Sequence, residues 1–215
     1  MITLYLVRHG ETTFNAEGRI QGHLDAPLSE LGICQAEAIA KRLASETFSK
    51  IYSSDLARAK VTAEIIATHH DLPVNTTPLL RESNLGIVQG LTRAEIEEQF
   101  PEKLNEWRHQ SATMRPPGAE TKEQVVQRCI LFLGIVIQQH SDGEKILVVG
   151  HGGSVRGIIV SALRLPIEAY GMMHYSNGSL TILDIGEKPA LWLMNDTCHL
   201  DSLRTDEEKV DEIAH

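Results

Sequence analysis

The chain has 215 residues, of which 42% are hydrophobic, and this length and composition suit one domain with one substantial core. Its formal net charge of -9 at pH 7 argues against a general nucleic-acid-binding role, because that role needs a basic face to displace counterions. The apolar stretch 130–137 is far shorter than the ~18 residues of a membrane span, and no basic segment precedes the first apolar run as in a signal peptide. We therefore expect a cytoplasmic protein that binds neither nucleic acid nor membranes.

Six short apolar segments of the chain are predicted to be strands, and helix-like segments separate most of them. This alternation is typical of a mainly parallel sheet with helices on both faces. The strand candidates are residues 2–7, 50–53, 73–75, 145–149, 180–185 and 190–194.

Three segments between these strands have apolar residues at helical spacing. The first covers residues 29–45 and has Ser29 as its N-cap, and the second covers residues 55–69. The third starts with a capping box of Thr121 and Gln124 and runs to about residue 140. The positions expected to face the core are Leu31, Cys34, Ala38, Ile39 and Leu43 in the first helix and Val126, Cys129, Leu133, Val136 and Ile137 in the third.

The cysteines are odd in number and widely separated, at Cys34, Cys129 and Cys198. They show no paired spacing of the kind found in disulfide frameworks or zinc sites. Because Cys34 and Cys129 fall on helix-like segments, we expect both to be buried packing residues.

Residues 82–120 are the largest irregular piece of a single domain that we place at residues 1–200. The piece contains two helix-like stretches, at 92–100 and 102–110. An excursion of this size between sheet elements predicts a helical cap over a functional site, although covering helices without a ligand role explain it equally well. Residues 201–215 form an acidic C-terminal tail, for which we expect a solvated helix or a frayed end.

Two of the predicted strands end in a histidine. The apolar run 4–7 leads into Arg8-His9-Gly10, and the run 145–149 leads into Gly150-His151-Gly152-Gly153. In open α/β sheets the ligand crevice lies outside the carboxyl ends of the strands, so the two histidines can face one site. An arginine next to the first histidine suggests chemistry on an anion.

Five blocks of residues carry a family resemblance, in the family's order and at its approximate spacing over residues 2–200. The blocks are Arg8-His9-Gly10-Glu11-Thr12 with Asn15; Gly22 with Asp25, Leu28, Gly32, Gln35 and Ala36; Tyr52-Ser53-Ser54-Asp55-Leu56-Ala57-Arg58-Ala59; Leu80-Arg81-Glu82; and Gly150-His151-Gly152-Gly153. With them the chain resembles the histidine phosphatase superfamily, whose relatives include the cofactor-dependent phosphoglycerate mutases. The resemblance implies a phosphoglycerate mutase-like α/β fold of three layers, with a mainly parallel central sheet flanked by helices.

Phosphoryl transfer needs a nucleophile, a cationic cradle for the phosphate oxygens and an acid for the leaving oxygen. The resemblance implies that His9 attacks phosphorus and forms a phosphohistidine, and that His151 is a further phosphate ligand. Arg8 and Arg58 suit the cradle because guanidinium is planar, permanently charged and able to pair with two phosphate oxygens at once. Arg58 also lies near a predicted helix start, where backbone amides favour an anion.

Further substrate-binding residues follow from the same resemblance. Asn15, Gln21 and Gly22 are implied to line the phosphate pocket, although Asn15 and Gly22 could equally be turn residues. The backbone amide of Gly152 is predicted to be an additional donor to the phosphate.

Glu82 follows Leu80-Arg81 at the place where the family has its general acid. A carboxyl group beside a bound phosphate would hold its proton more tightly because of the like charge. Glu82 is therefore predicted to protonate the leaving oxygen and then, as a base, to activate water. Glu11 and Arg81 are expected to support the site without chemistry of their own.

These residues leave several functions open. Residues 85–90 resemble the short form found in phosphatases more than the longer basic insertion of the mutases, so we expect a phosphatase that acts on a small phosphorylated metabolite without metal or cofactor. A cofactor-dependent phosphoglycerate mutase is the alternative within the family. A metal hydrolase is disfavoured, because His69-His70 and Cys198-His199 lack metal-ligand spacing. A phosphate-binding regulator without turnover is the alternative outside the enzymes.

Some features do not decide between these functions. The ending 195–200 resembles that of several small-metabolite phosphatases, and its His199 either contacts the non-phosphate end of the substrate or packs the C-terminus. The substrate candidates include phosphoglycerates, phosphoserine, sugar phosphates and a cobalamin-precursor phosphate. A homodimer is left open.

Overall fold

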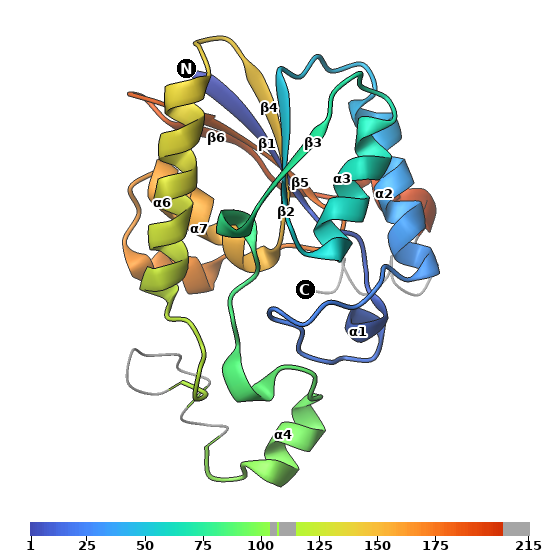
Figure 1. Ribbon diagram of the computed structural model, residues 1–215, viewed down its shortest axis with the longest axis vertical. Coiled ribbons are helices and arrows are strands. Elements are labelled where there is room, and N and C mark those ends of the chain that lie inside the picture. Colours follow the sequence, from blue (N-terminus) through green and yellow to red (C-terminus); the bar gives the residue numbers. More distant parts are fainter. Residues whose placement is uncertain (104–106, 108–114, 204–215) are drawn as a thin grey trace.

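The computed structural model describes residues 1–103, 107 and 115–203, and they form a six-stranded sheet between two pairs of helices (Figure 1). The strand order is β3-β2-β4-β1-β5-β6. The strands are β1 (Ile2–Arg8), β2 (Lys50–Ser54), β3 (Val74–Thr77), β4 (Lys145–Gly150), β5 (Leu180–Ile185) and β6 (Ala190–Asp196).

The central strands run parallel, and their register brings the two histidine-bearing strand ends together. β1 pairs in parallel with β4, and β2 pairs in parallel with both β4 and β3, whereas β5 and β6 are added antiparallel. Arg8 lies opposite Gly150 in the β1–β4 register, so His9 and His151 follow at neighbouring positions. The sheet thus confirms the expected α/β class with a mainly parallel core.

Each continuous apolar strand packs against helices on both faces of the sheet, because successive side chains point to opposite faces. Leu4 and Leu6 of β1 belong to the core beneath α6 (Lys122–Gln139) and α7 (Gly152–Ala162). Tyr5 and Val7 belong to the core beneath α2 (Glu30–Leu43) and α3 (Ala57–Ala67). Figure 1 shows these two helix pairs on opposite sides of the sheet.

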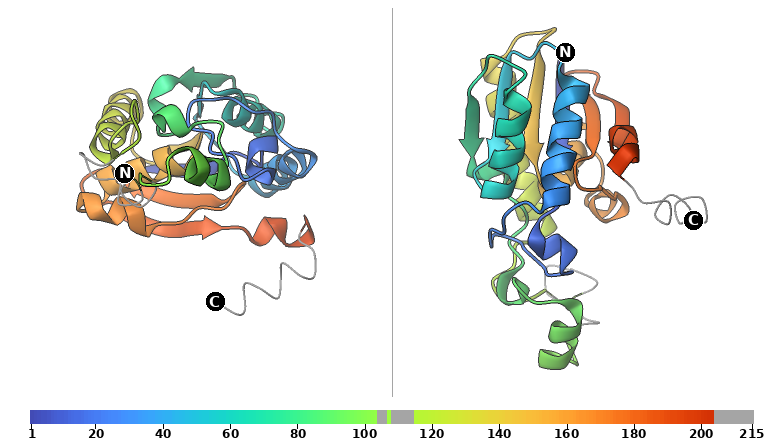
Figure 2. Two further views of the ribbon diagram at one scale, coloured as in Figure 1. Left: turned by 90° about the horizontal axis from the view of Figure 1, so that it is seen from below. Right: turned by 90° about the vertical axis from the view of Figure 1, so that its right-hand side faces the viewer.

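The remaining described elements are short. They are α1 (Thr13–Ala16), α4 (Arg93–Gln99) and the 3-10 helices η1 (Pro78–Leu80), η2 (Gly86–Val88), η3 (Ile167–Met172) and η4 (Cys198–Leu203). The described part of segment 82–120, with α4, extends beyond the carboxyl ends of the parallel strands in Figures 1 and 2. We propose that this segment is the cap of a single domain; most of the predicted helix 102–110 and of the tail 201–215 lies outside the described residues.

The predicted caps of two helices are confirmed. The side chain of Ser29 accepts a hydrogen bond from the Gly32 amide at 3.0 Å. Thr121 and Gln124 form the expected capping box at the start of α6. None of the described helices is long and apolar enough to cross a lipid bilayer.

The predicted buried faces of α2 and α6 need correction. Leu31 is 36% exposed, Ile137 is 53% exposed and Cys34 lies at the surface, although Cys129 is buried as expected. The buried residues of α2 are Gly32, Ala36, Ile39, Ala40 and Leu43, and those of α6 are Val125, Cys129, Phe132, Leu133 and Val136.

Close helix contacts explain this shift. Small residues of α2 are buried in place of Leu31 and Cys34, and a Cβ atom at Gly32 would lie 1.9 Å from the carbonyl oxygen of Glu11. On the other face, a Cβ atom at Gly157 of α7 would lie 2.6 Å from Cys129 Sγ. These contacts set the rotation of each helix, and a pattern of large apolar residues cannot reveal them.

Candidate active site

His9 lies directly after β1 and is 2% exposed. Its Nδ1 is 2.7 Å from the carbonyl oxygen of Gly10, and since that oxygen can only accept, Nδ1 carries the proton. Nε2 therefore keeps its lone pair. Burial, followed by the charges of Arg8 and Arg58, holds the pKa of His9 well below its ordinary value, so the imidazole is neutral at pH 7. Such an imidazole can act as a nucleophile.

His151 faces His9 from the start of α7. The two ring centroids are 5.0 Å apart, and the ring planes are inclined by 60°. The backbone amide of His151 donates to Ser154 Oγ at 2.9 Å, which fixes the first turn of α7. Burial, followed by the charge of Arg58, lowers the pKa of His151 as well, so both rings are neutral at pH 7.

Arg58 is the cation buried most deeply beside these rings, at 1% exposed. Its Nη2 donates to the carbonyl oxygen of Gly22 at 2.7 Å and its Nη1 to that of Leu24 at 2.8 Å. Arg58 therefore holds the loop after β1 against α3. Burial lowers its pKa, but a guanidinium titrates so far above neutral pH that it stays charged.

Buried polar atoms without a partner gather on the predicted site residues. Within the described chain, Arg8 Nε, Gln21 Oε1, Arg58 Nε and both ring nitrogens of His151 are buried and have no hydrogen-bond partner in the protein. Leaving such atoms unpaired costs about 1–3 kcal/mol each, so a fold keeps them where a ligand completes them. Four of the nine predicted site residues thus present unused polar atoms.

The start of α3 differs from expectation. The backbone amides of Ala57 and Arg58 were predicted to favour a bound anion, but both donate to the carboxylate of Asp25. The protein's own carboxylate therefore occupies this helix start. The Arg58 side chain is left as the contribution of α3 to the candidate phosphate site.

Two of the predicted substrate-binding residues in the loop after β1 also stabilise the loop itself. Asn15 closes the capping box of α1 with Thr12, and its Oδ1 also accepts from Asn177 at 3.3 Å. Gly22 has a φ of +56°, and a Cβ atom there would lie 2.1 Å from Gln89 Oε1, so a tight turn requires glycine. Asn15 and Gly22 thus hold turns of this loop, while Gln21 brings an unpartnered oxygen.

A pair of glycines lets α2 approach the loop that carries His9. A Cβ atom at Gly10 would lie 2.3 Å from the carbonyl oxygen of Gly32, and one at Gly32 would lie 1.9 Å from that of Glu11. Glu11 also accepts a hydrogen bond from the hydroxyl of Ser29 at 2.7 Å. The loop after β1 is therefore fixed by main-chain contact with the first turn of α2.

Glu82 lies beyond η1, where its carboxylate meets the first turn of α7. Its Oε1 accepts hydrogen bonds from the backbone amides of Ser83 at 2.7 Å and of Gly153 at 2.9 Å. A Cβ atom at Gly153 would lie 2.0 Å from the same oxygen, so only glycine admits this contact. The amide that Glu82 uses is thus the neighbour of the Gly152 amide that was predicted for the phosphate.

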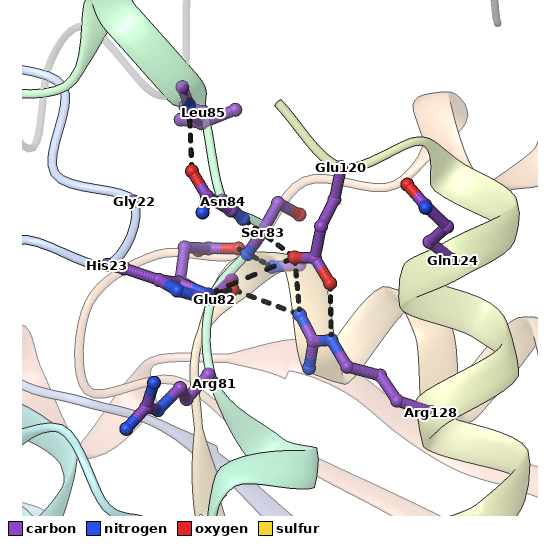
Figure 3. Close-up of polar contacts among 12 residues, drawn as sticks. Gly22, His23, Arg81, Glu82, Ser83, Asn84, Leu85, Glu120, Gln124 and Arg128 are labelled. Atoms are coloured by element: carbon purple, nitrogen blue, oxygen red, sulfur yellow. Dashed lines mark hydrogen bonds and ion pairs between the residues drawn. The ribbon is translucent and has the colours of Figure 1, made fainter. Parts of the chain in front are cut away.

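Three further residues hold the main chain of Glu82, and Figure 3 shows them around it. The carbonyl oxygen of Glu82 accepts from His23 Nε2 at 2.9 Å and from Arg128 Nη2 at 3.0 Å. Arg128 also pairs with Glu120 at 3.2 Å, and Glu120 in turn accepts from the amide of Asn84 at 2.7 Å. We call His23, Glu120, Arg128 and Gly153 the Glu82 clamp.

Sequence reasoning missed the side chains of the Glu82 clamp. Arg128 gave the clearest signal, because a charged residue stands beside the buried stripe of an apolar helix. Arg81, expected to be a supporting partner, forms a two-pronged ion pair with Asp55 at 2.6 and 2.7 Å. His199 bonds Arg42 and the carbonyl oxygen of Gly178, both at 2.9 Å, which is the packing role rather than a substrate contact.

No group of three or more His, Cys, Asp or Glu side chains among the described residues is arranged to hold a metal ion. The polar groups that meet at the strand ends are instead two neutral imidazoles, guanidinium groups and one carboxylate. This set can take up a phosphate, attack it and protonate what leaves.

Comparisons with known proteins agree with this set. Residues 4–197 match the histidine phosphatase superfamily (branch 1), so the chain belongs to this family and is an enzyme. Membership of the histidine phosphatase superfamily, expected from the sequence, is thereby confirmed, and similar solved structures confirm the phosphoglycerate mutase-like fold.

The proteins that this chain is similar to are named for different activities. The chain is 37% identical over 217 residues to a probable phosphoglycerate mutase, GpmB, of Yersinia pestis (strain Pestoides F), covering 96% of this chain and 99% of that protein. A mycobacterial glucosyl-3-phosphoglycerate phosphatase has a similar structure, with a TM-score of 0.82 at 33% identity over 91% of this chain and 99% of that one. A phosphoserine phosphatase from Entamoeba histolytica, in complex with 3-phosphoglyceric acid, gives a TM-score of 0.80 at 28% identity over 93% and 100%.

Proposed function

We propose that the protein is a metal-independent phosphomonoester hydrolase that acts on a small phosphorylated metabolite through a phosphohistidine at His9. The observation that carries this proposal is the state of His9: a neutral ring whose proton is held on Nδ1 by Gly10, among buried cations. That state is the one in which Nε2 can attack phosphorus.

The substrate's phosphate lies between Arg8, Arg58 and His151 in this proposal, and its oxygens accept from Arg8 Nε, Arg58 Nε and the protonated ring nitrogen of His151, which lack partners in the protein. Gln21, with Asn15, Gly22 and the Gly152 amide around it, borders the same group. As Nε2 of His9 bonds to phosphorus, negative charge develops on the equatorial oxygens, and the guanidinium groups stabilise it. The bond from phosphorus to the leaving oxygen breaks in the same step.

Glu82 is the proposed general acid and base. Its proton goes to the leaving oxygen as that bond breaks, which leaves a carboxylate next to the phosphohistidine. The carboxylate then takes a proton from water, whose oxygen attacks phosphorus while the bond between phosphorus and His9 Nε2 breaks. Inorganic phosphate leaves, and both His9 and Glu82 return to their starting states. The bonds from Ser83 and Gly153 hold the carboxylate in place throughout.

Rapid acid quench during turnover of a phosphomonoester tests the covalent step. The wild-type protein should carry acid-labile phosphate, and the His9→Ala variant should carry none, with phosphate release unchanged when a chelator is present. An unlabelled wild type at all quench times, with turnover continuing, would contradict the phosphohistidine. Loss of activity on chelation would instead support a metal hydrolase.

A phosphoglycerate mutase is the second candidate, and the similarity to the probable mutase of Yersinia pestis favours it. In that reaction a second substrate hydroxyl, and not water, accepts the phosphate from His9. Following 3-phosphoglycerate by NMR distinguishes the two activities, because a mutase produces 2-phosphoglycerate while a phosphatase releases inorganic phosphate. We expect release to exceed isomerisation. Binding of phosphate without either reaction would support the regulator.

A further inference from the structure

A second cavity adjoins Glu82, and His9, Arg58 and His151 do not line it. Its volume is about 190 Å³ within the described residues. It is lined by Glu82, Ser83, Leu85, Arg115, Pro116, Ala119, Glu120, Thr121, Lys122, Arg156 and Tyr170. The end of the proposed cap, the first turn of α6, α7 and η3 thus meet around one space.

Three cations line this cavity. Arg156 of α7 donates from Nε to the carbonyl oxygen of Met173 at 2.8 Å and lies 5.9 Å from the ring centroid of Tyr170. Its two terminal nitrogens have no hydrogen-bond partner among the described residues. Lys122 Nζ likewise makes no hydrogen bond or ion pair with a described residue, and Arg115 donates from Nε to the carbonyl oxygen of Ala119 at 2.8 Å.

The carboxylates of the cavity form no ion pair with Lys122 or Arg156. Glu120 lines the cavity, but it is already paired with Arg128 at 3.2 Å and with the amide of Asn84. Glu82 is held by the backbone amides of Ser83 and Gly153, which both donate to its Oε1. An anion in this cavity would therefore meet Lys122 and Arg156, neither of which forms an ion pair with a described residue, in a partly enclosed space where charge attraction is stronger than in water.

The position of the cavity beside Glu82 indicates which part of a substrate reaches it. A general acid lies beside the leaving oxygen, so the chain that continues from this oxygen has to pass Glu82. Glu82 lines the cavity, so a chain that passes Glu82 reaches it. At roughly 30 Å³ for each water-sized group, the cavity has room for about six such groups, which suits a short polar chain.

We propose that the leaving group of the substrate carries a second anionic group, a carboxylate or a second phosphate, and that Lys122 and Arg156 bind it with Arg115. This inference rests on the proposed function and assigns the substrate class of the same site. The three cations come from the end of the cap, α6 and α7. They lie outside residues 85–90, where the sequence resembles the short phosphatase form.

Three phosphomonoesters of similar length test the proposal. Glycerol 3-phosphate has an uncharged leaving group, 3-phosphoglycerate carries a carboxylate, and propane-1,3-diol bisphosphate carries a second phosphate. The wild-type kcat/KM for at least one of the two anionic compounds should exceed that for glycerol 3-phosphate by about tenfold or more, as one charge-assisted hydrogen bond provides. The compound that is preferred identifies the second group.

Variants at Lys122 connect this preference to the cavity. Lys122→Met should lower kcat/KM for the preferred compound about tenfold and that for glycerol 3-phosphate much less, and Lys122→Glu should reverse the preference. Inhibition by inorganic phosphate, which has no second group, should be equal in wild type and Lys122→Met. The matched control is Lys188→Met, in the turn between β5 and β6 at the opposite end of the sheet, where the preference should stay as in wild type.

Equal kcat/KM for the three compounds in an active wild type would overturn the inference and leave the proposed function standing. An equal loss for all three in Lys122→Met would overturn it too. If the wild type hydrolyses none of them and forms no phosphoenzyme, the proposed function fails instead. Calorimetric binding of the three compounds to His9→Ala still decides the subsite in that case: tighter binding of an anionic compound supports it, and equal binding contradicts it.

Discussion

The phosphate end and the leaving-group end of the candidate site are built in different ways. His9 and His151 follow two paired strands, and Arg58 lies in the first turn of a packed helix, so regular structure fixes the phosphate end. Glu82 lies on irregular chain, and the Glu82 clamp holds it by hydrogen bonds from three separate parts of the sequence. A rigid phosphate end suits a reaction shared by a whole family, and the irregular end is where substrates can differ.

The largest expected effect lies at the phosphate end. His9→Ala should lower kcat for any phosphomonoester by about 10⁴-fold or more, since loss of a covalent nucleophile removes the whole first step. Thermal unfolding should show that the variant stays folded, because the small cavity left behind opens toward the site. Substantial turnover in the folded variant would place the nucleophile elsewhere.

Gly153→Ala tests the leaving-group end without altering a reacting group. Its Cβ atom would lie 2.0 Å from Glu82 Oε1 and has to displace the carboxylate. Turnover of alkyl phosphates should fall by about 10²–10³-fold, as loss of general acid catalysis does. The phosphorylation burst with p-nitrophenyl phosphate should survive, because nitrophenolate leaves without a proton.

Glu82→Gln should give the same pattern, with a slow steady rate for the aryl phosphate after its burst, since the base for the second step is also lost. Equal damage to phosphorylation by alkyl and aryl phosphates would mean that Glu82 positions the site without donating a proton. The leaving-group end of the site would then not supply the acid of the reaction.

Arg58→Lys keeps the charge at the phosphate end and removes the planar fork. We expect kcat to fall by about 10²-fold, the usual effect of losing one donor to developing charge. The free energy of unfolding should also fall by about 1–3 kcal/mol, because a carbonyl oxygen of Gly22 or Leu24 loses its buried donor. Presteady-state kinetics and urea unfolding measure the two effects, and a change in KM alone would contradict the first.

The two buried histidines make stability depend on pH. The pKa values of both histidines are depressed in the folded state. At a pH between these depressed values and about 6.5, the unfolded chain therefore binds more protons than the folded chain. Stability should therefore be level above about pH 7.5 and fall with decreasing pH, by up to about 1.4 kcal/mol per pH unit for each histidine. Urea unfolding of His9→Asn should show a smaller slope, and the exposed His69→Asn serves as the control.

The smallest effect is expected away from both ends. Gly134 lies in α6, and a Cβ atom there would meet nothing within 4 Å. Gly134→Ala should leave kcat unchanged and raise the free energy of unfolding by about 0.5–1 kcal/mol, because alanine loses less backbone freedom in a helix. It is the matched glycine control for Gly153→Ala, and a loss of activity here would show that α6 cannot tolerate changes near the Glu82 clamp.

The same contrast explains how far the sequence could predict the molecule. β5 was predicted to the residue, and the other strands to within two residues, because apolar runs and the residues that end them are local signals. Capping boxes are local too. His9 and His151 were located because they follow such strands, whereas Arg58 and the roles of all three side chains came from the family resemblance.

The leaving-group end depends on distant partners instead. His23 and Glu120 are far from Glu82 in sequence, and neither residue type signals its contact, which His23 makes with the Glu82 carbonyl oxygen and Glu120 with Arg128 and the Asn84 amide. Asp25 likewise reaches the start of α3 from the loop after β1, so no local pattern could show that the amides there were already used. Side-chain pairs set by tertiary structure remained outside the prediction.

The contact between Gly10 and Gly32 restricts how this chain can evolve. A Cβ atom at Gly10 would meet the carbonyl oxygen of Gly32 and one at Gly32 would meet that of Glu11, so replacing one glycine does not create space for replacing the other. No second substitution at the other glycine relieves the clash of an added Cβ atom. The clash is avoided only if α2 moves away from the loop that carries His9. A side chain at either position therefore has to displace α2 or the loop that carries His9, so two residues without side chains set how closely this helix approaches the site.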